Sequence, residues 1–201
     1  MKEFARRFDL DTIPGISQLI HLDKTESTMN VARELAVSGV SENTLIIADV
    51  QTAGRGQLGR SWEAGEGGLY MTVMLRPQTA LRFLSDVSRL TADIVAGTLS
   101  DMYGVKTRVK LPNDVYAYHP ARGKWLKICG ILTESASSSE KSDWMIIGIG
   151  VNLNNKLYLD TAVSVKNILK KNVSIPEFLD GFFGNFWSRY SCWEYASRLK
   201  S

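Results

Sequence analysis

The chain has 201 residues, which is enough for one well-buried domain and too few for two of ordinary size. Hydrophobic residues make up 44% and charged residues 22%, which excludes disordered, collagen-like and coiled-coil chains. The 24 basic and 21 acidic residues leave a net charge of +3, too small for a protein that mainly neutralises nucleic acid phosphate. Two cysteines, Cys129 and Cys192, are too few for a disulfide framework and lack metal-ligand spacing to either histidine.

The sequence lacks signals that direct a protein to a membrane or out of the cytoplasm. Residues 1–10 are basic but no apolar run follows them, and their acidic residues argue against an organelle presequence. The longest apolar stretches, 45–48 and 144–151, are far too short to span a bilayer. We therefore expect a soluble, cytoplasmic protein without a membrane partner.

The first half of the chain predicts alternating strands and helices. Three β-rich runs indicate strands at 19–22, 45–50 and 69–75. A helix is predicted over 28–38, because its apolar residues share one face, Ser27 or Thr28 can cap its start and Gly39 suits its end. A second helical period runs over 81–103.

The second half predicts strands followed by one long helix. The expected strands are 107–111, 115–118, 126–134 and 144–153. Ser174 and Glu177 form a capping-box pattern that opens a helix over 176–198, whose aromatic stripe we interpret as core packing. Because strands cluster between helices, we expect an α+β fold: a mixed, largely antiparallel sheet covered by helices, as one domain over 1–201.

The glycine-rich segment 51–62 is the most specific local feature. It contains G-x-G-x-x-G at Gly54, Gly56 and Gly59, but a second glycine-rich stretch and a strand follow it instead of a helix, which excludes a dinucleotide fold. No Gly-Lys-Ser/Thr closes it as in a P-loop. Its backbone N–H groups and Arg55 could clamp a phosphate, or the segment could be a solvated hairpin tip; the spacing does not decide.

Three further strings offer chemistry. Asp114 could hold Mg²⁺, although an Asn-Asp turn is more often structural. Lys127 heads a run that should be buried, so it needs an anionic partner or a solvated cleft. Gly148 and Gly150 share one face of a predicted strand, a pattern typical of close approach by a ligand or by another part of the backbone.

In this order, these strings resemble the catalytic domain of biotin–protein ligases, in the biotin/lipoate ligase superfamily. The matching pieces are Ser27-Thr28, QTAGRG at 51–56 with GRSW at 59–62, KLPNDV at 110–115, KICGILTE at 127–134 and GIGVNLN at 148–154. The resemblance covers about residues 20 to 155. It implies the superfamily's fold, which is similar to that of class II aminoacyl-tRNA synthetases.

The resemblance also implies a reaction. ATP and biotin would condense to biotinyl-5′-adenylate with release of pyrophosphate, with Mg²⁺ as cofactor. The biotinyl group would then pass to a lysine ε-amine on the biotin carboxyl carrier domain of a biotin-dependent carboxylase. Fixed cations would offset the repulsion between carboxylate and polyphosphate. We expect no nucleic acid partner, and either a monomer or a homodimer.

The matched motifs assign the site residue by residue. Catalytic roles fall to Arg55, Lys110, Asp114 and Lys127, with Asp114 also the candidate magnesium ligand. The biotin-binding set is Ser27, Thr28, Met29, Gln51, Gly54, Arg55, Gly56, Gln57, Lys127, Gly130 and Gly148. The nucleotide-binding set is Arg55, Gln57, Trp62, Asn113, Lys127 and Asn152, with Trp62 stacked on the adenine.

The chain departs from the family pattern at several points. Gln57 stands where the family usually has Arg, which predicts a leakier hold on the adenylate. Leu111 replaces a common Trp and Met29 a common Asn. Many members continue into a C-terminal β-barrel or begin with a DNA-binding helix-turn-helix; residues 1–20 cannot build the latter, so we expect no repressor activity.

Two other functions remain open at this point. A lipoate or octanoate ligase shares the fold, but that family carries a different glycine-rich string with a nearby histidine, and no histidine lies in 51–68. A non-catalytic biotin or adenylate binder is the other alternative. Formation of biotinyl-adenylate with release of pyrophosphate separates a biotin ligase from both.

Overall fold

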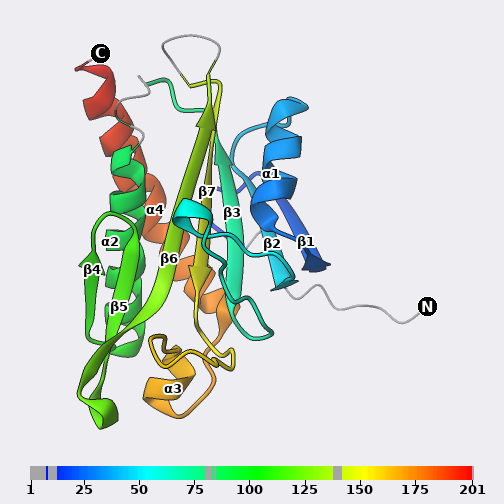
Figure 1. Ribbon diagram of the computed structural model, residues 1–201. Helices are drawn as coiled ribbons and strands as arrows, with labels where there is room; N and C mark the ends of the chain where they lie inside the picture. Colours follow the sequence, from blue (N-terminus) through cyan, green and yellow to red (C-terminus); the bar gives the residue numbers. More distant parts are fainter. Residues whose placement is uncertain (1–7, 9–12, 80–82, 84, 138–141, 201) are drawn as a thin grey trace.

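A computed structural model describes residues 8, 13–79, 83, 85–137 and 142–200. Two predictions concern residues that lie largely outside these ranges: the interpretation of residues 1–10 and the start of the second helix at 81–84. One sheet of seven strands, in the order β1-β2-β3-β7-β6-β5-β4, forms the centre (Figure 1). The strands are β1 (Gln18–Thr25), β2 (Thr44–Gln51), β3 (Leu69–Leu75), β4 (Thr107–Lys110), β5 (Asp114–His119), β6 (Lys124–Ala136) and β7 (Trp144–Val151).

The mixed, largely antiparallel sheet predicted from the sequence is confirmed. Only β1 and β2 are parallel among the named strand pairs of the described chain; the other neighbours are antiparallel. A parallel pair needs a crossover, and α1 (Thr28–Val37) supplies it. Strands β3 and β7 lie in the middle of the sheet, and their nearly continuous apolar sequences are buried along almost their whole length.

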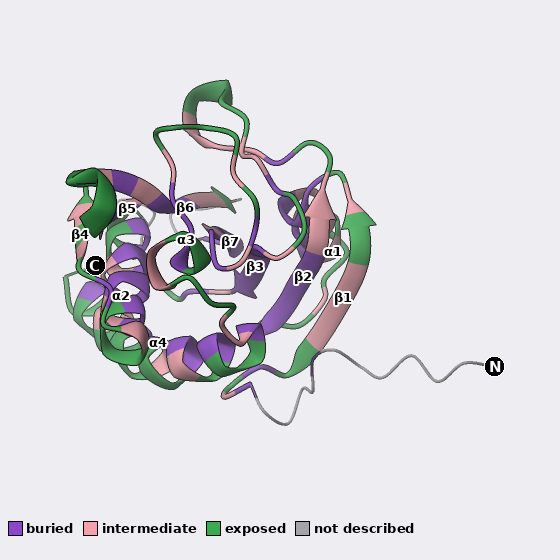
Figure 2. Ribbon diagram, turned by 90° about the horizontal axis from the view of Figure 1, so that it is seen from below, coloured by how far each residue is buried: buried purple, intermediate pink, exposed green. Residues whose placement is uncertain are grey.

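The two faces of the sheet are covered by different helices. Helix α1 packs on one face against Ile46, Met74 and Ile146. Helices α2 (Ser85–Tyr103) and α4 (Ile175–Arg198) pack side by side on the other face, which carries the larger core (Figure 2). No helix in the described ranges combines the length and apolar character needed to cross a membrane.

The local signals at helix ends were read correctly, with one omission. Ser27 caps α1 by accepting a hydrogen bond from the Met29 backbone N–H, and Ser174 caps α4. The aromatic stripe of α4 is buried in the core, as predicted: Phe178, Phe182, Phe183, Phe186 and Tyr190. The sequence analysis missed the short helix α3 (Val165–Leu169), which opens with a capping box between Ser164 and Asn167.

Candidate active site

A hollow opens on the α1 face of the sheet, just beyond the N-terminal end of α1. Along β7 this face carries apolar side chains up to Ile146 and then Gly148 and Gly150. Gly130 of β6 lies opposite Gly150 in the strand pairing. Because successive strand side chains alternate between faces, these three glycines remove the side chains that would fill this part of the α1 face.

The pocket in this hollow is lined by segments from across the chain. Its lining residues are Ser27, Thr28, Met29, Gln51, Arg55, Gly56, Gln57, Trp62, Tyr70, Met71, Asn113, Lys127, Gly130, Ile131, Leu132, Gly148, Ile149 and Gly150. The sequence analysis did not assign Tyr70, Met71, Ile131, Leu132 or Ile149 to the site. Most of these are ordinary strand residues, and only their register beside the glycines brings them into the pocket.

Two large side chains lie on the glycine floor. A Cβ on Gly148 would come within 2.6 Å of the Met29 sulfur, and one on Gly150 within 2.7 Å of the Trp62 indole. The free space inside the pocket is about 50 Å³, well below the several hundred Å³ of typical ligand sites. Met29 and Trp62 therefore occupy much of the space above the glycine floor.

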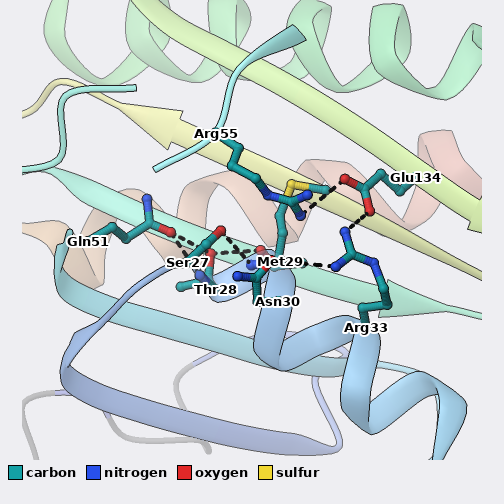
Figure 3. A network of polar contacts seen from close by, with 9 residues as sticks. Ser27, Thr28, Met29, Asn30, Arg33, Gln51, Arg55 and Glu134 are labelled. Atoms are coloured by element: carbon teal, nitrogen blue, oxygen red, sulfur yellow. Dashed lines mark hydrogen bonds and ion pairs between the residues drawn. The ribbon is translucent and has the colours of Figure 1, made fainter. Parts of the chain in front are cut away.

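A chain of hydrogen bonds forms the polar end of the pocket at the start of α1. The Thr28 backbone N–H donates to Gln51 Oε1 at 2.8 Å, and the Thr28 hydroxyl donates to the same oxygen at 3.1 Å (Figure 3). The buried Thr72 hydroxyl donates to Thr28 Oγ1 at 2.8 Å. These bonds fix the Gln51 amide beside the first turn of the helix.

The glycine-rich segment folds into a closed loop over the pocket. The Gly56 N–H donates to the Arg60 carbonyl, and the Trp62 N–H donates to the Gly54 carbonyl. A Cβ on the buried Gly54 would lie 2.5 Å from the Trp62 carbonyl oxygen, so this close approach requires glycine. The closure directs Arg55 into the pocket and leaves Arg60 exposed, so the segment is more than a solvated hairpin tip.

The Arg55 guanidinium is held by charge rather than by hydrogen bonds. One of its Nη atoms lies 3.1 Å from Glu134 Oε1, an ion pair by distance. That nitrogen and Nε are nevertheless buried without a hydrogen-bond partner in suitable geometry. Arg55 therefore keeps donors for a further acceptor, such as a carboxylate or a phosphate.

A β-bulge places Lys127 in the pocket. Val115 of β5 lies opposite Cys129, but the next residue, Tyr116, lies opposite Lys127, so Ile128 is an extra residue in β6. Without the bulge, alternation would turn Lys127 to the core face with Cys129; with it, Lys127 joins Gly130 on the pocket face. Its ammonium lies 2.7 Å from Asp114 Oδ1 and 5.3 Å from the centre of the Trp62 ring.

Several residues that the sequence analysis assigned to the site do not line the pocket. Lys110 is exposed at the end of β4, with its ammonium 5.5 Å from the centre of the Tyr116 ring. Of the three cations expected in the pocket, Arg55 and Lys127 line it and Lys110 does not. Asp114 does not line the pocket either; its carboxylate lies beside it, in contact with the Lys127 ammonium. Asn152 is buried and accepts a hydrogen bond from the Asn155 amide at 3.0 Å.

Asn113, which the sequence analysis assigned to the nucleotide-binding set, does reach the pocket. Asn113 lines it and donates its amide to the Ile131 carbonyl at 2.8 Å. Burial raises the pKa of the Tyr70 hydroxyl and of the Cys129 thiol, so these two groups stay neutral. Cys129 therefore acts as a small apolar core residue.

Potential metal ligands are grouped elsewhere. Among the described residues, one group brings three such atoms within 4.8 Å of one another: His21, Asp23 and Asp49. By strand alternation these side chains lie on the face that carries Leu45 and Ile47, away from α1. Asp114 offers a single carboxylate beside the pocket, and its assignment to Mg²⁺ stays a prediction.

Comparison with known proteins identifies the class to which this architecture belongs. An α+β sheet of this kind is found in the biotin protein ligase from Aquifex aeolicus in complex with biotin and ATP, with a TM-score of 0.73 and 28% identity, over 90% of this chain and 74% of that one. The model of the biotin/lipoate A/B protein ligase family matches residues 21–152. The chain belongs to this family, which confirms the resemblance.

Individual relatives refine this placement. The chain is 38% identical over 157 residues to the bifunctional ligase/repressor BirA of Bacillus subtilis, which covers 78% of this chain and 46% of the relative. It is 35% identical over 134 residues to the biotin–[acetyl-CoA-carboxylase] ligase of Paracoccus denitrificans, covering 66% and 53%. The chain thus spans about half the length of these curated relatives.

Proposed function

We propose that the chain is an ATP-dependent biotin–protein ligase, which forms biotinyl-5′-adenylate and transfers the biotinyl group to a lysine of a biotin carboxyl carrier domain. The main support is one observation: Arg55 and Lys127, from distant stretches of sequence, line the same pocket beside a floor of glycines. The relatives named as biotin ligases, and the Aquifex complex with biotin and ATP, support the choice of substrates.

The two ends of the pocket suit the two ends of biotin. The hydroxyls of Ser27 and Thr28 and the Gln51 amide offer donors and acceptors for the polar ureido ring. The glycine floor and neighbouring apolar side chains, including Ile149, offer a dry slot for the thiophane ring and its tail. In this orientation the carboxylate points toward Lys127 and Arg55.

The first step joins a carboxylate to a polyphosphate, so like charges must approach. A biotin carboxylate oxygen attacks the α-phosphorus of ATP, the bond to the bridging oxygen breaks, and pyrophosphate leaves. Arg55 and Lys127 offset the charge, each through bonds typically worth about 1.5–3 kcal/mol. Lys127 must exchange its contact with Asp114, and Arg55 its contact with Glu134, at least in part, to take up the incoming anion.

The residues fit a magnesium ion that is carried mainly by the substrate. Asp114 Oδ1 is buried without a hydrogen bond in suitable geometry and lies 2.7 Å from the Lys127 ammonium, so it can act as an oxygen ligand when Lys127 turns to the substrate. A single carboxylate together with phosphate oxygens is a common donor set for Mg²⁺. When bound, the ion would neutralise phosphate charge.

The second step needs an enclosed adenylate. The neutral ε-amine of the acceptor lysine attacks the carbonyl carbon of the mixed anhydride, the bond from that carbon to the AMP oxygen breaks, and AMP leaves while the nitrogen loses one proton to solvent to give the amide. Trp62 and the loop that carries Arg55 cover the pocket, which keeps water from the anhydride. We propose a carboxylase carrier domain as the acceptor, in line with the name of the Paracoccus relative, a biotin–[acetyl-CoA-carboxylase] ligase.

The test uses the full chain with labelled ATP, Mg²⁺ and one acid at a time: biotin, lipoate or octanoate. We expect pyrophosphate release and an acyl-adenylate with biotin, and labelled biotin on an added carrier domain. Turnover with lipoate or octanoate in place of biotin would assign the chain to the other branch of its family. Binding of biotin without pyrophosphate release would make it a non-catalytic binder and overturn the proposal.

A further inference from the structure

We propose that Glu134, oriented by Arg33, is a positioning residue that holds the Arg55 guanidinium at the rim of the pocket before substrate binds. Its contribution to turnover rests on the ligase function proposed above; its contact with the glycine-rich loop does not.

Three separate elements meet at this carboxylate (Figure 3). Arg33 comes from α1, Arg55 from the glycine-rich loop and Glu134 from β6. Glu134 Oε1 lies 3.1 Å from an Arg55 Nη atom, and its Oε2 accepts from an Arg33 Nη atom. The other Nη of Arg33 donates to Asn30 Oδ1 at 3.4 Å, within the same helix. Each oxygen of the carboxylate therefore has its own cation.

The position of Glu134 in the sheet explains this arrangement. It lies opposite Ile146 of β7, on the face that α1 covers, and two residues beyond Leu132 of the pocket wall. The three charged side chains are 27% to 37% exposed, so solvent screens them less than it screens a pair on the open surface. The carboxylate thus lies between the helix and the loop, where each can contact it.

Removing the carboxylate has two physical consequences. Arg33 and Arg55 would then be two like charges without the carboxylate that each now contacts. Arg55 also lies between Gly54 and Gly56, whose backbones are permissive, so the loop would lose one of its side-chain ties to the sheet, alongside that of Trp62. Glu134 contacts Arg55 through one Nη atom and leaves Nε without a partner, so it orders the loop in advance while part of the guanidinium can still take up the substrate anion.

The first test needs no activity. Amide hydrogen exchange of residues 51–62 is measured in the ligand-free protein and in Glu134→Gln. We expect exchange about three- to tenfold faster in the variant, because the loop opens more often. Asp93→Asn is the control, since it breaks only the exposed 4.0 Å Arg89–Asp93 pair on α2. Equal loop exchange in Glu134→Gln and in the unmodified protein would overturn the proposal.

The second test measures coupling to Arg55. Rates of biotinyl-adenylate formation are compared for Glu134→Gln, Arg55→Met and the double variant. We expect about a tenfold loss for Glu134→Gln, and none beyond Arg55→Met in the double variant, because one residue acts through the other. Arg33→Met should cost about threefold. Additive losses would show that Glu134 acts elsewhere and would overturn the positioning role.

The two tests also separate the two proposals. If the unmodified chain forms no adenylate, the ligase function fails, and the hydrogen-exchange result still decides whether Glu134 orders the loop. If adenylate forms but loop exchange is unchanged in Glu134→Gln, the ligase function stands and the positioning proposal fails. A thermal melt of each variant confirms that it is folded.

Discussion

The same strands build two faces of the sheet with opposite character. The face under α2 and α4 carries a continuous apolar core that includes the rings of Phe178, Phe182 and Phe186. The face under α1 is packed over only part of its length and then ends in glycines, two cations and hydroxyl groups. Stability and ligand binding are therefore assigned to different sides of one sheet, and a substitution on one side tests that side alone.

Truncation on the apolar face should give the largest effect. Phe182 is fully buried and stacks on Phe178 and Phe186, so Phe182→Ala leaves a cavity in the core. We expect a loss of about 3–5 kcal/mol in the free energy of unfolding. Urea titration measures it; biotin affinity of the folded fraction should not change. A loss of biotin affinity at full folding would contradict the division between the faces.

Loss of the pocket ammonium should slow catalysis strongly without unfolding the protein. Lys127→Ala is expected to slow adenylate formation about ten- to a hundredfold, because it removes a charge-assisted contact to the reacting groups. Pyrophosphate release measures it. Lys124→Ala is the matched control, an exposed lysine on the same strand, and should stay within about twofold of the unmodified rate. An unchanged rate in Lys127→Ala would contradict the assignment.

A methyl group on the glycine floor should affect binding more than stability. Gly150→Ala places a Cβ 2.7 Å from the present Trp62 indole position, so the ring must shift and the floor rises. We expect biotin affinity to fall about tenfold, as measured by calorimetry. Gly184→Ala on α4 is the control, because a Cβ there meets nothing within 4 Å. Equal affinities for both variants would mean that the glycine floor does not contact biotin.

The smallest expected effect concerns retention of the intermediate. Gln57 lines the pocket but carries no charge. Gln57→Arg adds a cation near the adenylate, so we expect biotinyl-adenylate to leave about three- to fivefold more slowly. A filter-binding chase measures the release rate, with Leu58→Arg at the exposed loop tip as the charge-matched control. Release no slower than from the unmodified chain would refute the prediction.

Local chemistry determined much of this protein from its sequence. The caps at Ser27 and Ser174, the aromatic stripe of α4 and the apolar runs of β3 and β7 are all short-range patterns, and each gave the correct element. The ordered motifs also led to the family. Some strand boundaries differ from the prediction because strand pairing, and not local composition, sets them. Strand β1 extends over Gln18–Thr25, beyond its apolar stretch, because its backbone is hydrogen-bonded along β2.

Only the tertiary structure decided how the motifs meet. The bulge at Ile128 depends on the register of β6 against β5 and turns Lys127 into the pocket, which alternation along β6 would not predict. The same geometry leaves Lys110 outside, although the sequence analysis placed it with Lys127. Glu134 and Arg33 are 101 residues apart and carry no joint sequence signal. Strand register and the approach of a helix to a sheet are long-range properties, so residues far apart in the chain acquire their roles only when the sheet forms.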